Sequence, residues 1–577
     1  MNAECLLTHY EKIAEAPDAI ARLRRFILDL AVRGKLEPQD PKDEPASDLL
    51  KRIRREKARL VKAGEIRVPK AIPDLPEPPF RIPSSWRWSQ LAEIGVLNPR
   101  NEAPDTLEAS FVPMPLIAAE YGAANQHDVR PWGGIKKGYT HFAEGDVGLA
   151  KITPCFENGK STVFRNLTGG IGSGTTELHI VRPLFVDQDY ILLFLKSPHF
   201  IETGIPRMTG TAGQKRVPTQ YFAHSPFPLP PLAEQQRIVA KVDELMGLCD
   251  RLAAARAERE AVRDRLAAAS LARLNAPDPE TFRSDARFAL DALPALTTRP
   301  DQIKALRQTI LNLAVRGKLV PQDANDEPAS ELLKRIAKAH PRKQRSRAVS
   351  TNQDGPGYER DYLGLPTGWM LASLEAISSF ENGDRSSNYP SGSDIKADGV
   401  PFFSTKNLSD YRLQFTNLDF ITTAKFESLR SGKLQDQDIL ITLRGSVGKF
   451  GLFEASEAIT TGFINAQLLI IRCVDRALVP YLMICMRSDD FSDQIALLSS
   501  GSATPQLSAG KLAEALIPLP PLAEQHRIVA KVDALMAFCD RLEASLTATV
   551  ATRRRLLDAL LAEALAPDAE RVLEAAE

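Results

Sequence analysis

The stretch PLPPLAEQQRIVAKVDELMGLCDRL at residues 228–252 returns as PLPPLAEQHRIVAKVDALMAFCDRL at residues 518–542. Only positions 236, 244, 247 and 248 of the first copy differ, so 21 of 25 residues are identical. Near the N-terminus, LAVRGKL at 30–36 returns unchanged at 313–319, and PQD, DEPAS and LLKRI follow it in both copies. An offset of 283 to 290 residues is far longer than a solenoid repeat and indicates two copies of a domain-sized unit.

The bulk composition is that of a globular protein of several domains. The chain has 577 residues and carries 73 Lys plus Arg against 73 Asp plus Glu, so any nucleic-acid site must be local. The six cysteines show no metal-ligand spacing, which favours reduced thiols in the cytoplasm. The chain begins without a signal-peptide core and contains no apolar run of about 18 residues, so the expectation is a soluble protein without a membrane partner.

Each unit has the same order of segments. It opens with a predicted short helix that Gly34 or Gly317 is placed to end. The apolar face of this helix consists of Ile20, Leu23, Ile27 and Leu30, matched by Ile303, Leu306, Ile310 and Leu313. A Pro-rich or basic linker follows, and then a variable segment with short β-type runs such as DVGLAKI and DILITLRG. These runs predict mixed α/β domains, each with a twisted sheet.

The block after PLPP predicts a long helix in each copy. Pro231 and Pro521 fit a helix start, and Glu234 and Glu524 suit its positive end. A coiled-coil seam at 4-3-4-3 spacing is formed by Ile238, Val242, Leu245, Cys249 and Leu252, and again by Ile528, Val532, Leu535, Cys539 and Leu542. Each helix either packs on its own domain, or the two pair antiparallel around a pseudo-two-fold axis. We predict the second arrangement, with about 40 residues in each helix and the first short helix near the C-terminal long helix.

The predicted fold class is α+β, with two mixed domains joined by two long antiparallel coiled-coil helices. The predicted boundaries are 1–86 for the first repeat helix and linker, 87–227 for the first variable domain, 228–275 for the central long helix, 276–369 for the linker and second repeat helix, 370–517 for the second variable domain, and 518–577 for the C-terminal long helix.

The segment KITPCFENGKST at 151–162 resembles the end of a phosphate-binding P-loop. A P-loop needs a glycine five residues before Gly159, but Pro154 stands there and has no N–H. The pattern therefore argues against an ATPase. It predicts a turn at Glu157-Asn158-Gly159 that presents Lys160 to a phosphate.

Other chemistry is not indicated either. The methyltransferase tetrapeptide (N/D)PP(Y/F/W) does not appear, since Asn98-Pro99 is followed by Arg100, and no cofactor loop rich in glycine appears. A nuclease pattern forced from Asp40-Pro41-Lys42 loses its lysine in the second copy, and the eight histidines lack metal-ligand spacing. We expect no catalytic residue, no metal site and no cofactor in this chain.

DNA contact is predicted from loops that combine cations, hydroxyls and glycines, although neither variable domain is basic overall. Glycine permits close backbone approach, Lys and Arg neutralise phosphates, and Arg, Gln, Asn, Ser or Thr can read base edges. The candidates are Lys136, Lys137, Lys160, Arg207, Thr209, Thr211, Gln214, Lys215 and Arg216 in the first domain, and Lys406, Asn407, Arg444, Ser446, Lys449, Ser502, Thr504 and Gln506 in the second. The alternative for each loop is a solvent-exposed surface turn without a binding role.

Two divergent domains, each preceded by LAVRGKL and followed by PLPPLAEQ.RIV.KVD.LM..CD.L, resemble the specificity subunit of a type I restriction–modification system. The resemblance implies that each variable domain reads one half of an asymmetric bipartite double-stranded DNA site. It also implies that the repeated helices set the spacing and dock two methyltransferase subunits, with restriction motor subunits completing the complex. S-adenosylmethionine, ATP and Mg²⁺ would then belong to the partners.

Two alternatives stay open at this point. One is the recognition subunit of a related modification system of the type IIG kind. The other is a coiled-coil scaffold with two lobes that bind carbohydrate or protein instead of DNA, which the neutral variable domains would permit. A steep salt dependence of DNA binding would exclude the second alternative.

Overall fold

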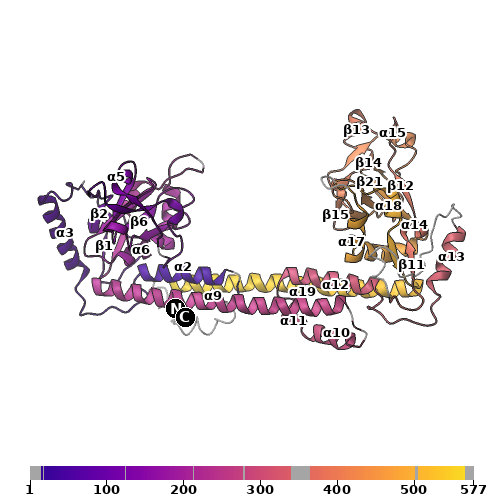
Figure 1. Cartoon of the computed structure of the whole chain (residues 1–577), viewed down its shortest axis with the longest axis horizontal. Coiled ribbons are helices and arrows are strands. Elements are labelled where there is room, and N and C mark those ends of the chain that lie inside the picture. Colours follow the sequence, from indigo (N-terminus) through magenta and orange to yellow (C-terminus); the bar gives the residue numbers. More distant parts are fainter. Residues whose placement is uncertain are drawn as a thin grey trace, which may run out of the picture. The chain divides into compact units, whose positions relative to one another are not determined.

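The computed structural model describes residues 15–16, 18–69, 71–123, 125–211, 213–276, 278, 280–339, 364–500 and 505–565. These residues fall into two compact units. The first comprises residues within Met1–Glu260 and Thr549–Glu577, and the second those within Ala261–Ala548. Each unit holds one variable domain on a helical base, and each of the two long helices has one part in either unit (Figure 1).

The first variable domain contains two four-stranded sheets with the orders β2-β9-β6-β7 and β4-β3-β8-β5. A two-stranded ribbon of β1 and β10 joins the beginning of the domain to its end, with Arg87 opposite Leu229. The strands are β1 (Arg87–Ser89), β2 (Gly95–Leu97), β3 (Glu108–Val112), β4 (Asp128–Pro131), β5 (Thr140–Ala143), β6 (Val147–Ala150), β7 (Ser161–Val163), β8 (Ile171–Gly174), β9 (Leu178–Pro183) and β10 (Phe227–Leu229).

The second variable domain repeats this plan in a different sequence. Its sheets have the orders β12-β21-β18-β19-β16-β15 and β13-β17-β14-β20, and β11 pairs with β22 as the closing ribbon. The strands are β11 (Met370–Ser373), β12 (Ser378–Asn382), β13 (Ile395–Lys396), β14 (Val400–Phe403), β15 (Leu408–Ser409), β16 (Arg412–Leu413), β17 (Asp419–Ile421), β18 (Ile439–Thr442), β19 (Phe450–Leu452), β20 (Phe463–Ile464), β21 (Leu468–Cys473) and β22 (Leu516–Leu519).

Helices form the base of each unit and the links between the sheets. Those of the first copy are α2 (Ala19–Val32), α3 (Ala46–Lys62), α4 (Leu91–Ile94), α5 (Trp132–Ile135), α6 (Gln188–Lys196), α7 (Pro198–Gly204), α8 (Thr219–His224) and α9 (Leu232–Asn275). Those of the second are α10 (Phe282–Asp291), α11 (Leu293–Leu296), α12 (Pro300–Val315), α13 (Ala329–Ala339), α14 (Leu374–Ile377), α15 (Thr423–Ser428), α16 (Val479–Met486), α17 (Asp489–Leu498), α18 (Ala509–Ala513) and α19 (Leu522–Leu565). Both long helices, α9 and α19, have 44 residues, which confirms the predicted helices.

In the first unit, α2 contacts both the beginning of α9 and the end of α19. It runs antiparallel to α9 and parallel to α19, so the two long helices run antiparallel to each other here, as predicted. The contacts that set these directions are Arg24 with Asp250 and Arg256 with the Ala16 carbonyl for α9, and Arg22 with Asp558 and Lys35 with the Leu565 carbonyl for α19. The prediction that the first short helix lies near the C-terminal long helix is confirmed.

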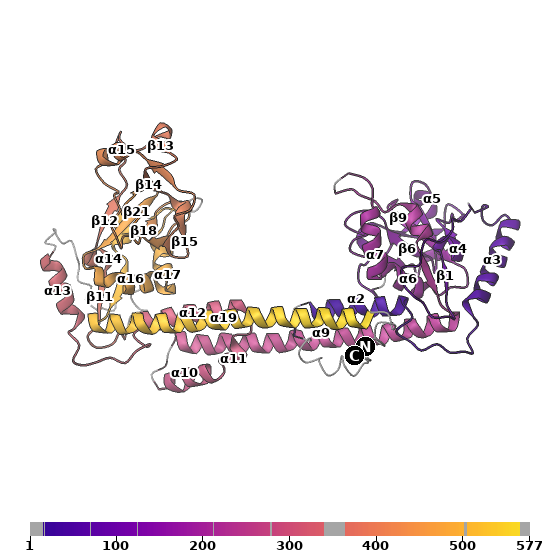
Figure 2. The same ribbon diagram turned by 180° about the vertical axis from the view of Figure 1, so that it is seen from behind.

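The second unit has the same arrangement with the roles exchanged. Helix α12 lies along the first half of α19 (Figure 2) and also contacts the end of α9. The contacts are Arg307 with Asp540 and Gln322 with Glu524 for α19, and Arg299 with Asp264 and Thr309 with Asn275 for α9. These directions again make α9 and α19 antiparallel within the unit.

The two repeated glycines end the short helices. Gly34 has φ +67° and Gly317 has φ +65°, a left-handed conformation that glycine adopts without a steric penalty. A Cβ on Gly317 would lie 2.4 Å from Pro366 Cγ and 3.1 Å from Trp369. The repeated glycine and tryptophan are therefore parts of one packed corner.

Candidate nucleic-acid interface

Two predicted loops of the first variable domain lie side by side. The Thr209 amide donates to the Arg216 carbonyl at 3.0 Å and the Arg216 amide donates back at 2.8 Å, which closes a hairpin. The Thr153 amide donates to the Lys215 carbonyl at 2.9 Å, so the KITP segment pairs with the base of the hairpin. The exposed candidates on this hairpin are Thr209, Thr211, Gln214 and Lys215, and Arg207 is exposed just before it.

The predicted turn before Lys160 is present, and Gly159 has φ +67°. Lys196, a buried residue at the end of α6, holds this turn in position. Lys196 Nζ donates to the Gly159 carbonyl at 3.0 Å and to the Ala119 carbonyl at 2.8 Å. Lys160 itself is half-buried, and its Nζ donates to the Met114 carbonyl at 3.3 Å. Its role at a phosphate stays a prediction.

The second variable domain builds the same junction. The Gln506 amide donates to the Ser500 carbonyl at 2.8 Å, and Arg444 forms a bridge with Gln506, as Ile152 does with Arg216 in the first domain. The predicted loops thus meet in both copies. Two further candidates of the second domain, Ser502 and Thr504, lie outside the described residues.

A tight turn at residues 445–448 completes the second junction. The Thr442 amide donates to the Lys449 carbonyl at 2.8 Å, and the Lys449 amide donates to Thr442 Oγ1 at 3.0 Å. Gly445 and Gly448 have φ values of +77° and +81°. The turn leaves Arg444, Ser446 and Lys449 exposed.

The candidate side chains differ in their exposure and in whether they form ion pairs or hydrogen bonds within the protein. Arg207, Lys215, Arg444, Lys449 and Lys137 are exposed. Three others form ion pairs: Lys136 with Asp105, Arg216 with Glu177, and Lys406 with Asp419. Asn407 is only 2% exposed, and its Oδ1 accepts from the Ser404 amide at 2.9 Å, so it caps a local turn instead of facing solvent.

Each variable domain contains an Asp–Arg pair with a buried aspartate that the sequence analysis missed, at the end of the central strand (β6 or β18) away from the junction. In the first domain Arg182 Nε and an Nη group each contact Asp146 at 2.9 Å, and in the second Arg472 contacts Asp438 at 2.8 and 2.7 Å. Both aspartates are 1% exposed. Burial raises the pKa of each aspartate, and the neighbouring arginine opposes this shift. Their signal in the sequence is the aspartate just before each central strand.

Hydrogen bonding and burial shift the pKa values of three side chains around the first hairpin. The hydrogen bonds from Arg216 lower the pKa of the Glu177 carboxyl. Burial lowers the pKa of His179 to about 4, so this histidine is neutral near pH 7, and its Nε2–H donates to the Val217 carbonyl at 3.1 Å. Burial also lowers the pKa of Lys196 to about 7.

The repeated motifs pack on one another. Gln39 of PQD donates to Glu234 of PLPPLAEQ at 2.9 Å, and Arg237 contacts Asp43 of DEPAS at 2.7 Å. The second copy has the same contacts, with Gln322 and Glu524 at 3.1 Å and Arg527 and Asp326 at 2.6 Å. Mutual packing therefore accounts for much of the identity between the copies.

The predicted seam residues are mostly buried, and they pack against the short helix and domain of their own unit. Ile238, Val242, Leu245 and Cys249 join the cluster that contains α2 and α6, and Ile528, Val532, Leu535, Cys539 and Leu542 join the one that contains α12 and α16. Leu252 is half-buried. The seam residues other than Leu252 thus pack within their own units, which is the alternative that the sequence left open.

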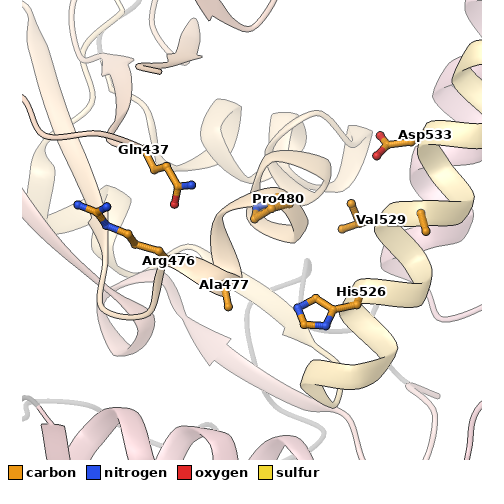
Figure 3. Close-up of a pocket in the computed structure, with 8 residues that line it drawn as sticks. Gln437, Arg476, Ala477, Pro480, His526, Val529 and Asp533 are labelled. Carbon is orange, nitrogen blue, oxygen red and sulfur yellow. The ribbon is translucent and has the colours of Figure 1, made fainter. Parts of the chain in front are cut away.

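The two units differ at one pair of matching aspartates on the long helices. In the first unit the Tyr121 hydroxyl donates to Asp243 of α9 at 2.7 Å. The matching residue of the second unit, Asp533, lines a groove of about 510 Å³ with His526 and Val529 of α19. Figure 3 shows these side chains on α19 opposite Arg476 and Gln437 of the variable domain.

No group of three or more His, Cys, Asp or Glu side chains in the described residues could hold a metal ion. None of the helices found in that part of the chain is both long and apolar enough to cross a membrane.

The fold and the two junctions define a class of protein: two different loop surfaces are carried by one duplicated helical scaffold. A family profile described as type I restriction modification DNA specificity domain matches residues 366–552. The chain is 38% identical over 556 residues to the type I restriction enzyme EcoAI specificity subunit of Escherichia coli, covering 94% of this chain and 93% of the relative. It is 38% identical over 562 residues to the EcoEI specificity subunit of the same species, covering 95% and 94%.

A solved structure of the HsdS subunit from Thermoanaerobacter tengcongensis covers 84% of this chain and 98% of its own, with 21% identity and a TM-score of 0.47. On the identity to its relatives over nearly the whole chain, this protein belongs to the type I restriction enzyme specificity subunits.

Proposed function

We propose that each variable domain reads one half of an asymmetric bipartite DNA sequence through its loop junction, and that α9 and α19 set the spacing between the halves. The observation that carries the proposal is the repeated junction. Ile152 with Arg216 and Arg444 with Gln506 form the same bridge on matching scaffolds. The side chains that the two junctions expose differ, so the two half-sites should differ.

The proposed contacts divide into two kinds. Arg207, Lys215, Arg444 and Lys449 are exposed cations at the junctions and suit phosphates or guanine edges. The hydroxyls and amides of the hairpins, such as Thr211, suit base edges. We leave Asn407 out of this interface because its side chain is buried within a turn.

The scaffold is proposed to dock two methyltransferase subunits, and restriction motor subunits complete the assembly. The antiparallel helices and the duplicated corners around Gly34 and Gly317 offer two related surfaces, which suits two copies of one partner. We propose that this chain is not itself an enzyme and binds no cofactor, so that S-adenosylmethionine, ATP and Mg²⁺ belong to the partners. The buried free thiols, for instance Cys249 and Cys539, fit a cytoplasmic location.

The experiment is a genome-wide methylation map of cells with and without the gene, supplied with the methyltransferase encoded beside it. The expected result is a methylated motif of two unlike halves around a fixed gap, which disappears on deletion. No change in methylation with an active methyltransferase would refute the proposal.

Loop variants assign each half to its domain. Arg207→Ala with Lys215→Ala should relax the half read by the first domain, and Arg444→Ala with Lys449→Ala the other half. Lys51→Ala on α3, which removes an exposed cation paired with Asp48, is the control and should leave the motif unchanged.

A further inference from the structure

Tyr411 stands in an unusual turn of the second variable domain. Strands β15 and β16 pair with Ser409 opposite Arg412, so Asp410 and Tyr411 form a two-residue hairpin loop. Their φ values are +50° and +60°. Loops of this kind favour Asp or Asn followed by glycine, because both central residues are left-handed. Asp410 fits the pattern, whereas a tyrosine occupies the position that favours glycine.

The ring of Tyr411 is held on one side and open to solvent on the other. The guanidinium of Arg487, at the end of α16, lies 4.8 Å from the ring centroid, and the ring of Phe450 lies 5.1 Å away. The Leu452 amide donates to the Tyr411 carbonyl at 3.0 Å and ties the turn to β19. The side chain nevertheless remains 43% exposed. An ordered aromatic ring is thus presented at the surface at low conformational-entropy cost for a ligand.

The position of this ring is beside the loop junction. Phe450, which the ring contacts, directly follows Lys449 of the turn at 445–448. The first domain has a related arrangement. Lys196, at the end of α6, fixes the segment around Ala119 to the turn before Lys160. Both domains thus use a basic side chain at the end of a buried helix to place a surface segment against the junction. The tyrosine of the first segment, Tyr121, is hydrogen-bonded to Asp243 of α9, whereas that of the second, Tyr411, lies beside Arg487 with its ring partly exposed.

We propose that Tyr411 is a specificity-determining residue whose ring packs against a base of the half-site read by the second domain. This inference rests on the proposed function of the junctions. Arg444 and Lys449 would hold the phosphates nearby, while the ring supplies an apolar surface for a base face or a thymine methyl group. The strained turn is then retained because it orients the ring.

The conformation alone does not carry this assignment, because Phe185 shares it. Phe185 has φ +55°, is 49% exposed and lies 5.3 Å from the guanidinium of Arg52 on α3. It lies between β9 and α6, and none of the junction loops is among its neighbours in these ring contacts. The nearness of Tyr411 to the junction is what distinguishes the two residues, and Phe185 provides a matched control.

The test measures DNA binding by the complex of the full chain with its methyltransferase partner. Fluorescence anisotropy is recorded with a duplex that carries the motif identified by the methylation map. It is also recorded with duplexes in which one base pair of either half is altered. The variants are Tyr411→Gly, which removes the ring and suits the left-handed backbone, Tyr411→Phe, and Phe185→Gly. Tyr411→Asn replaces the glycine variant if that one fails to fold, since asparagine also tolerates this conformation.

The expected result is a loss of affinity of about tenfold for Tyr411→Gly, together with loss of discrimination at one position of a single half-site. Tyr411→Phe should keep both, and Phe185→Gly should bind as the wild type does. Wild-type affinity and an unchanged discrimination profile for the ring-less variant would overturn the assignment of Tyr411 alone. If the wild-type complex itself failed to distinguish altered duplexes, the proposed function would fall, and the inference with it.

Discussion

Replacing Leu557 by alanine should detach the end of α19 from α2. Leu557 is fully buried in a small cluster in the first unit. Its partners are Ala16, Ala19, Leu560 and Leu561, with Leu23, Phe26 and Leu556 at the edge. Leu557 is completely buried, whereas Leu560 and Leu561 remain 6% and 8% exposed, so its truncation leaves a cavity inside the cluster. A buried leucine replaced by alanine costs about 2–5 kcal/mol.

This cost should appear as local opening, because the rest of the unit does not depend on the cluster. The measurement is amide hydrogen exchange of the α19 residues from 549 to 565. A loss of 2 kcal/mol corresponds to roughly 30-fold faster exchange, since about 1.4 kcal/mol is a factor of ten. Leu266→Ala, on a 37% exposed position of α9, should have a far smaller effect and serves as the control.

The functional consequence follows from the spacing role of the helices. In the complex with the methyltransferase, Leu557→Ala should reduce methylation of the complete bipartite site more than it reduces binding to either half alone. Protection of residues 549–565 equal to that of the wild type would refute the reasoning that α2 holds this helix end. The same argument predicts a loss of methylation for Leu23→Asp, because Leu23 contacts both the α9 and the α19 clusters.

Three further predictions concern stability. Arg472→Met should destabilise the second domain by about 3–5 kcal/mol in denaturant titrations, because it leaves Asp438 buried without its partner, whereas Arg476→Met, at an exposed arginine, should be nearly neutral. Gly317→Ala should destabilise by about 1–3 kcal/mol, because φ is +65° and the new Cβ would meet Pro366, while Gly510→Ala in α18 should not destabilise. For Lys196 the folded pKa of about 7 lies below the usual 10.5, so the unfolded chain binds more protons between these values. Stability should therefore rise with pH from about 7 towards 10, and Lys196→Met should remove this slope in thermal unfolding followed across that range.

The sequence predicted the scaffold well because its signals are local. The 4-3 spacing after PLPP and the helix-ending glycines each depend on neighbours within a few turns, and the duplication can be read from direct comparison of the two segments. The structure contains the helices that these signals predict. The variable domains were predicted only as a class, because their sheets join strands far apart in the chain, such as β2 with β9.

The candidate site was predicted in part. In the first domain the loop that contains Lys160 meets the hairpin before the PLPP block, and in the second Arg444 pairs with Gln506 before the other PLPP block. Asn407 proved to be a buried turn cap. Lys196 and Tyr411 gave no usable signal, and the Asp146–Arg182 pair gave only an aspartate just before a strand. A lysine at the end of an apolar helix or a lone tyrosine in a loop has many environments open to it.

By itself the sequence determined that two copies of one scaffold carry two unlike domains, since identity between repeats is found by comparing the amino-acid sequences of the two segments. Only the tertiary structure decided what that identity serves. It joins Gln39 to Glu234 and Arg237 to Asp43, which are about 195 residues apart, and so shows the repeated motifs packing on one another. It also decided which cations already form ion pairs, because Arg216 and Lys406 are paired with carboxylates that no local pattern brings to them. The physical reason is that burial and pairing depend on which distant segments fold together, whereas helix formation depends on spacing within the segment.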